Sequence, residues 1–165
     1  MTSLTQARLK ELLSYNSDTG EFVWRVSHRG PHPAGRRAGS DKGNGYWQII
    51  IGGRNYLAHR LAWLYAHGEF PPDQLDHING NRSDNRLVNL RPATPAQNTR
   101  NAKLWSSSTS GLKGVSYDKR ADKWRANITV NYKQKFLGRF STAEEAHAAY
   151  VKAAEAMHGE FARAA

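Results

Sequence analysis

Apolar and polar residues alternate most regularly in the segment 123–131. The apolar positions are Trp124, Ala126, Ile128 and Val130. This alternation predicts a strand with one apolar and one polar face. The segments 111–118 and 133–140 have a similar composition, and turn residues separate the three. We therefore expect a sheet of three short strands in the last third of the chain.

A helix is expected to follow this sheet over residues 141–159. Ser141 stands at the N-cap position with Glu144 three residues later, the spacing of a capping box, and Gly159 is the expected stop. Residues at three- and four-residue steps predict its buried stripe, namely Ala146, Tyr150, Ala153 and Met157. If the helix covers the apolar face of the sheet, the polar face is left open.

Patterns in the first half of the chain predict shorter elements. In order, we expect a helix over 3–14, a strand after the turn at Asp18-Thr19-Gly20, a loop over 27–45, two strands around Gly52-Gly53, and a helix ending at Gly68. The segment 105–111, WSSSTSG, lacks an apolar period and is typical of a linker. We expect one domain over 1–104 and a second over 112–165.

The segment 75–101 concentrates polar residues around an Asn-Gly turn. It predicts a strand, a loop, a second strand and a helix with Pro95 at its first position, which would bring Asp76, His77 and Asn98 together. Carboxylate and amide oxygens are hard ligands suited to Mg²⁺. A neutral imidazole can act as a general base near pH 7, and an acceptor from the Asn89 region would fix its tautomer.

Composition and charge narrow the class of protein. The chain has 165 residues, 24 Lys and Arg against 14 Asp and Glu, and no cysteine, which excludes disulfides, Cys-ligated zinc and a thiol nucleophile. No apolar run approaches the roughly 18 residues of a membrane span, and the amphipathic N-terminus is unlike a signal peptide, so we expect a cytoplasmic protein (the host cytoplasm, if phage-encoded).

The charge is unevenly distributed in the second domain. Residues 113–139 carry eight basic and two acidic side chains, whereas residues 141–160 carry one basic and four acidic side chains. A cationic sheet backed by an anionic helix is typical of a module that binds nucleic acid.

The run DHINGNRSDNRLVNLRPATPAQN resembles the HNH endonuclease motif, with its ββα-metal fold, of phage and intron-borne homing endonucleases. The preceding YLAHRLAWLYAHGEFPP resembles the segment that leads into it. The resemblance implies that His77 is the general base, that Asp76 and Asn98 bind a divalent ion (Mg²⁺ or Mn²⁺), and that Asn89 orients the histidine. The last motif position, Asn98, stands where the name-giving second histidine would be.

The runs KGVSYDKRADKWRANI and KFLGRFSTAEEAHAAY resemble the Apetala-two (ethylene-response-factor) DNA-binding domain, which lays a three-stranded sheet into the major groove. By this resemblance and by the alternation of polar residues, the residues expected at DNA are Lys113, Arg120, Lys123, Arg125, Asn127, Thr129 and Phe136. Arg91 and Arg100 flank the nuclease motif and are expected to bind phosphate, with a solvated surface position as the alternative.

Together these features predict an α+β protein. Its nuclease core, with N-terminal hairpins and helices, would precede a three-stranded antiparallel sheet packed on one C-terminal helix. The expected activity is metal-dependent hydrolysis of double-stranded DNA. One catalytic motif cuts one strand, so a double-strand break would need a homodimer or two sequential cuts. Two rivals are a DNA-binding regulator with an inactive HNH fold and an RNA-binding accessory protein. His59 is expected to be a packing or capping residue rather than a second base.

Overall fold

The computed structural model describes residues 4–27, 33–101, 110–130 and 133–162. The chain divides into two compact units, Met1–Thr94 and Pro95–Ala165. Both combine helices with small antiparallel sheets, which confirms the predicted α+β class. Most of the predicted linker, residues 105–109, lies outside the described residues, so the linker stays a prediction. In the described part of the chain, no helix has the length and apolar character that crossing a bilayer requires.

The first unit begins with a helix and a hairpin. The elements are α1 (Gln6–Leu12), β1 (Leu13–Asn16) and β2 (Glu21–Trp24). Thr5 caps α1, its hydroxyl accepting a hydrogen bond from the Arg8 amide at 3.2 Å. The predicted helix over 3–14 is too long, because Leu13 and Ser14 pair with β2 instead. This hairpin partner was missed, since the leucines fit a helix and a strand equally well.

A second sheet and a helix follow the hairpin in the first unit. They are β3 (Ser40–Asp41), β4 (Trp47–Ile51), β5 (Arg54–Leu57) and α2 (Ala58–His67). The Gly52-Gly53 turn and the stop at Gly68, whose φ is 86°, are confirmed. The short strand β3 lies inside the expected loop, where it pairs with the start of β4.

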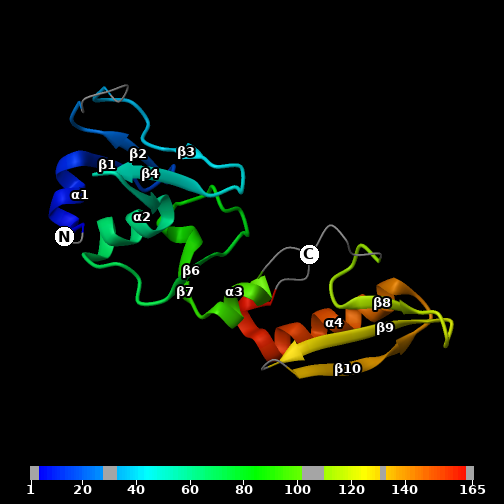
Figure 1. Cartoon of the computed structure of the whole chain (residues 1–165). Coiled ribbons are helices and arrows are strands. Elements are labelled where there is room, and N and C mark those ends of the chain that lie inside the picture. Colours follow the sequence, from blue (N-terminus) through cyan, green and yellow to red (C-terminus); the bar gives the residue numbers. More distant parts are fainter. Residues whose placement is uncertain (1–3, 28–32, 102–109, 131–132, 163–165) are drawn as a thin grey trace. The chain divides into compact units, whose positions relative to one another are not determined.

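These elements enclose one apolar core. Its fully buried side chains come from α1, the hairpin, β4 and α2 and are Leu9, Leu13, Phe22, Ile49, Leu61 and Leu64. Leu90 belongs to the same cluster and starts the strand β7 (Leu90–Ala93). Its partner is β6 (Gln74–His77), and the short helix η1 (Leu87–Asn89) precedes β7. The core therefore anchors the β6–β7 ribbon, which carries the nuclease-like motif (Figure 1).

The second unit starts with α3 (Pro95–Asn101), followed by three strands and a helix. They are β8 (Val115–Asp118), β9 (Lys123–Val130), β10 (Lys133–Phe140), α4 (Ala143–His158) and the short η2 (Gly159–Phe161). The antiparallel sheet has the order β10-β9-β8, and α4 covers one face of it (Figure 1). The expected sheet and its covering helix are confirmed.

The start of α4 differs from the prediction by one residue. Thr142, not Ser141, is the N-cap: its hydroxyl accepts from the Glu145 amide at 3.2 Å, and the Glu145 carboxylate accepts from the Thr142 amide at 3.3 Å. The same carboxylate also accepts from the Ser141 amide. Of the predicted buried stripe, Ala146 and Tyr150 are buried and Ala153 and Met157 are half-buried, while Ala154 is buried instead of Ala153.

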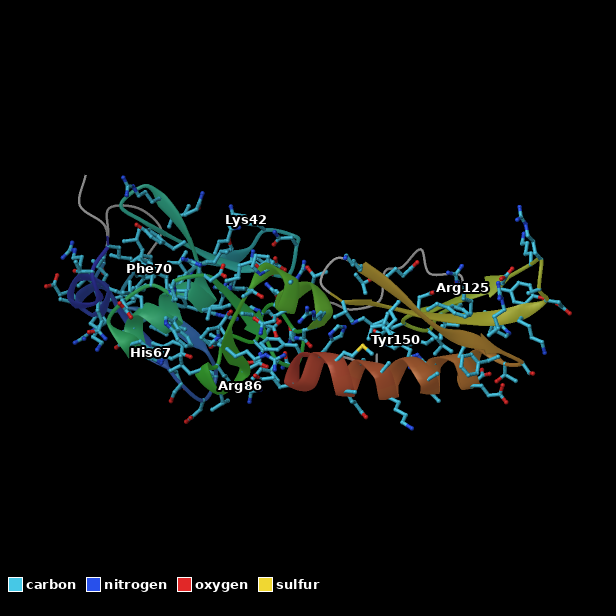
Figure 2. The ribbon with its side chains drawn as sticks, turned by 90° about the horizontal axis from the view of Figure 1, so that it is seen from below. Lys42, His67, Phe70, Arg86, Arg125 and Tyr150 are labelled. Carbon is cyan, nitrogen blue, oxygen red and sulfur yellow. The ribbon has the colours of Figure 1, made fainter. Side chains whose placement is uncertain are left out.

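Gly114 lies where no side chain fits. Its φ is +76°, and a Cβ there would overlap the Tyr150 ring, which points from α4 into the sheet (Figure 2). We expect Gly114→Ala to destabilise the protein by more than about 1 kcal/mol, as measured by urea unfolding. Gly111→Ala is the control, because Gly111 also has a positive φ but faces open space. Equal losses for the two variants would contradict the proposed overlap.

Candidate active site

Strand β6 ends in two buried polar residues, Asp76 and His77, which are 3% and 4% exposed. Asp76 lies directly opposite Arg91 in the register of β6 and β7. The Arg91 guanidinium donates from Nε and from a terminal nitrogen to Asp76 Oδ2, at 2.9 and 2.8 Å. Arg91, which the sequence suggested as a phosphate contact, therefore directs its guanidinium at the Asp76 carboxylate.

The His77 ring is enclosed by three side chains, those of Asn85 in the following loop and of His59 and Tyr46 earlier in the chain. Its Nε2 lies 3.4 Å from the Asn85 Oδ1. The rings of His59 and Tyr46 pack against it with centroids 5.0 and 6.0 Å away. Burial lowers the pKa of His77 below its usual range, against the smaller opposing effect of Asn85. The imidazole is therefore neutral near pH 7, the state a general base requires.

His59 at the start of α2 is a packing residue. Its ring meets the His77 ring edge-on, and Tyr46 covers it with centroids 5.4 Å apart. Burial, together with repulsion from His77 and Arg60, lowers the pKa of His59 to about 3. Its Nδ1 is buried and has no hydrogen-bond partner among the described residues. This agrees with the packing role rather than with a second base.

The Asn89 side chain does not take the predicted role on the imidazole directly. Its Oδ1 accepts from the Asn79 amide at 3.0 Å, and its Nδ2 donates to the Asp84 carbonyl at 2.8 Å. Asn89 thus braces the loop that follows His77. The physical reason is that this tight loop leaves backbone groups to satisfy, and the Asn89 amide can satisfy a donor and an acceptor at once.

Asp84 holds the same loop from the other side. Its carboxylate accepts from Asn79 Nδ2 at 2.7 Å and from the Arg86 guanidinium at 2.8 and 2.7 Å. These bonds, that to Arg86 foremost, lower the pKa of Asp84 to about 2. These bonds therefore hold the loop 78–86 in one conformation beside His77.

The N-terminal hairpin contacts this loop through residues that sequence patterns did not identify. The Tyr15 hydroxyl donates to the Asn85 carbonyl at 2.8 Å, and burial raises the pKa of Tyr15 to about 12. Gly20, with φ +74°, lies so close that a Cβ would stand 2.7 Å from the Asn85 carbonyl carbon and 2.5 Å from the Arg86 nitrogen. No local signal indicates these contacts, because about 70 residues separate the partners.

The donor set can be tested for the expected divalent ion. Asp76 offers a carboxylate, a hard donor with acceptor sites on both oxygens. Among the described residues, no cluster of three or more His, Asp and Glu side chains could enclose a metal ion. A carboxylate of this kind suits an ion such as Mg²⁺, which keeps water and phosphate oxygens among its ligands; in this structure Asp76 Oδ2 is bonded to Arg91.

Asn98 and Arg100, the other predicted site residues of this motif, lie on α3 in the second unit. Asn98 is half-buried, and the Arg100 carbonyl accepts a hydrogen bond from Lys113 Nζ at 2.7 Å. That the Asn98 side chain lies close to Asp76 stays a prediction.

The open face of the β8–β9–β10 sheet carries most of the predicted DNA contacts. Arg125, Asn127 and Thr129 alternate along β9, and Phe136 lies opposite Asn127. Arg125 donates to Asn127 Oδ1 at 3.2 Å, and its guanidinium lies 5.3 Å from the Phe136 ring centroid. Figure 2 shows Arg125 on the side of the sheet away from α4. The alternation thus predicted correctly which side chains lie on the face that α4 leaves open, and their contact with DNA stays a prediction.

Arg139 also lies on this face, where the alternation of residues did not predict it. Strict alternation from Phe136 places Arg139 on the opposite face, but a β-bulge between Phe136 and Gly138 shifts the register. Arg139 then faces Arg125 across the strands, stacks 5.6 Å from Phe136, and pairs with Asp118 at 3.0 Å.

The remaining predicted contacts lie at the edges of the sheet. Arg120 is exposed in the β8–β9 turn, and Lys123 is exposed with its Nζ 3.3 Å from the Ser141 hydroxyl. Lys113 is half-buried and bonded to α3 as described. The basic face is therefore centred on the Arg125, Arg139 and Phe136 cluster.

Comparison with known proteins agrees with this arrangement. Residues 56–100 match the HNH endonuclease family and residues 110–160 match the AP2 domain. The chain is 39% identical over 106 residues to Protein 3.8 of Escherichia phage T7, spanning 64% of this chain and 87% of that protein. The chain belongs to the HNH endonuclease family.

Two further relatives carry the HNH name. An uncharacterized HNH endonuclease of Acanthamoeba polyphaga mimivirus is 35% identical over 106 residues, which span 63% of this chain and 54% of that protein. A Bacillus subtilis protein named as an SPbeta prophage-derived HNH homing endonuclease is 39% identical over 59 residues, 35% of this chain and 34% of its own length. The HNH match includes Asp76, His77, Asn89 and Asn98.

The ion pair between Arg91 and Asp76 gives a stability prediction for this HNH protein. Arg91→Ala should destabilise it by about 3–5 kcal/mol, because it removes the arginine from a buried carboxylate. Arg82→Ala should cost far less, since Arg82 is exposed. Urea unfolding of both variants measures the difference, and equal stabilities would contradict a buried ion pair at this position.

Proposed function

We propose that this protein is a metal-dependent endonuclease that nicks double-stranded DNA, with His77 as its general base. The observation that carries the proposal is the buried Asp76–His77 pair at the end of β6, inside the segment that matches the HNH family. Carboxylate and neutral imidazole side by side are the groups that phosphodiester hydrolysis needs, one to hold a cation and one to accept a proton.

In this proposal each residue of the site has a separate role. His77 accepts a proton from the water whose oxygen attacks phosphorus, while the bond from phosphorus to the 3′ oxygen breaks. The departing oxygen takes a proton from solvent water, which leaves 3′-hydroxyl and 5′-phosphate ends. Asp76 and Asn98 would hold Mg²⁺ or Mn²⁺. When bound, the ion offsets negative charge on the phosphate and the departing oxygen. Asn89 and Asp84 keep the loop beside His77 in place, so that the base stays oriented.

The basic open face of the β8–β9–β10 sheet would bind the DNA. Arg125 and Arg139 lie directly opposite each other, and like charges in that position are unfavourable in an isolated protein. Asp118 and Phe136 offset part of that repulsion by an ion pair and by cation–π contacts. A phosphate backbone or the acceptor edge of guanine would offset the remainder, which supports this face as the DNA-binding surface.

The first test of the nuclease proposal removes the base. His77→Ala should abolish nicking of supercoiled plasmid in Mg²⁺ or Mn²⁺, because no proton acceptor remains, while DNA affinity in a gel-shift assay stays near the wild-type value. EDTA should abolish nicking by the wild type. His67→Ala is the control, since His67 is an exposed histidine of α2 stacked on Trp63.

A wild-type protein that binds DNA but never nicks it would favour the rival function, a DNA-binding regulator with an inactive HNH fold. Wild-type nicking by His77→Ala would instead contradict the assignment of the base alone. Preference for structured RNA over duplex DNA in competition would favour an RNA-binding role.

Arg125 tests the sheet. Arg125→Ala should weaken DNA binding by about 1–3 kcal/mol if it contacts a base edge, and should reduce the salt dependence by about one unit of slope if it contacts phosphate. Fluorescence anisotropy with duplex DNA at several salt concentrations distinguishes the two. Lys152→Ala, on the exposed side of α4, is the control. Unchanged affinity at every salt concentration would remove β9 from the interface.

A further inference from the structure

The contact between His77 and Asn85 carries information about which nitrogen of the imidazole is basic. A neutral imidazole has one N–H and one lone pair, and a hydrogen bond at one nitrogen decides where the proton resides. Here Nε2 faces the Asn85 Oδ1 at 3.4 Å, and both residues are buried. An amide oxygen only accepts hydrogen bonds, so Nε2 must donate for this contact to be favourable.

The orientation of the Asn85 amide is fixed by its other contacts. Its Nδ2 donates to the Ser83 carbonyl at 3.1 Å, so exchange of the amide oxygen and nitrogen would place two acceptors against each other. The Asn85 backbone is held by the Tyr15 hydroxyl and by the close approach of Gly20. The oxygen is therefore directed at His77 by a rigid frame built from the N-terminal hairpin.

We propose that Asn85 is a positioning residue that selects the Nε2–H tautomer of His77 and so makes Nδ1 the proton-accepting atom. The proposal rests on the nuclease function proposed above, which it deepens. Asn89, the amide that the sequence favoured for this role, has both polar atoms engaged with the backbone of the loop. The two asparagines thus act differently, one on the loop and one on the imidazole.

The tautomer can be read directly. We would record long-range ¹H–¹⁵N NMR spectra of the full-length protein with ¹⁵N-labelled histidine, without metal or DNA. At about pH 8 the ring is neutral, since an ordinary imidazole has a pKa of about 6.5. Wild-type His77 should show a protonated Nε2 and an unprotonated Nδ1. A dominant Nδ1–H form in the wild type would overturn the proposal without any variant.

Three variants distinguish an effect on the His77 tautomer from an effect on folding. Asn85→Leu removes the acceptor at similar volume and should shift His77 towards the Nδ1–H form, whereas Asn85→Asp keeps an acceptor and should keep the Nε2–H form. Asn81→Leu is the matched control: Asn81 Oδ1 also bonds Ser83, accepting from its amide at 3.1 Å, but the residue is exposed in the same loop. It should leave the tautomer unchanged.

Activity should follow the tautomer. Single-turnover nicking should fall about 10–100-fold in Asn85→Leu, by analogy with the loss of a group that orients a metal-bound histidine, and should be largely retained in Asn85→Asp. An Asn85→Leu protein that keeps both the Nε2–H form and wild-type nicking would overturn the proposal. If the wild type does not nick while the tautomer shifts in Asn85→Leu, the nuclease function is contradicted and the assignment to Asn85 stays supported.

Discussion

The structure around the candidate site depends on one constraint: the loop 78–86 lies outside the β6–β7 pairing, so its conformation must be fixed by hydrogen bonds from side chains. The loop follows β6 directly and cannot join a sheet. Asn79, Asp84 and Asn89 replace sheet partners with short polar side chains that reach the backbone or one another. This explains why the segment is rich in asparagine. The same bonds fix the end of β6, and with it the directions of Asp76 and His77.

This constraint also explains why the N-terminal hairpin matters to a site 60 residues away. A loop closed only by its own side chains could still move as a body relative to β6. Tyr15 and Gly20 prevent this from one side, by a hydrogen bond and by close backbone packing. On the other side the rings of His59 and Tyr46 pack against His77. The hairpin, α2 and the loop thus enclose the imidazole, and the common apolar core holds the hairpin and α2 in place.

The sequence predicted what depends on local signals. The Gly52-Gly53 turn, the stop at Gly68 and the alternation along β9 follow from the conformations of a few neighbouring residues, and the motif around Asp76 and His77 was evident from spacing. What escaped prediction depends on distant partners. Leu13 joins a strand because β2 offers a register, and Arg139 changes face because of one bulge. Asn85 could not be chosen over Asn89, since only the folded loop determines which amide reaches the ring.

The Asp76–Arg91 pair adds an electrostatic consequence to the proposed function. An arginine cannot release its proton, so it offsets the carboxylate charge at every physiological pH. A cation approaching Asp76 therefore meets a nearly neutral pair, and a single carboxylate in that state attracts it weakly. A DNA phosphate bound there, as the proposed function requires, would restore negative charge. Under the proposed function, ion and DNA would then bind together more strongly than either alone, which would limit metal capture by the protein before the substrate arrives.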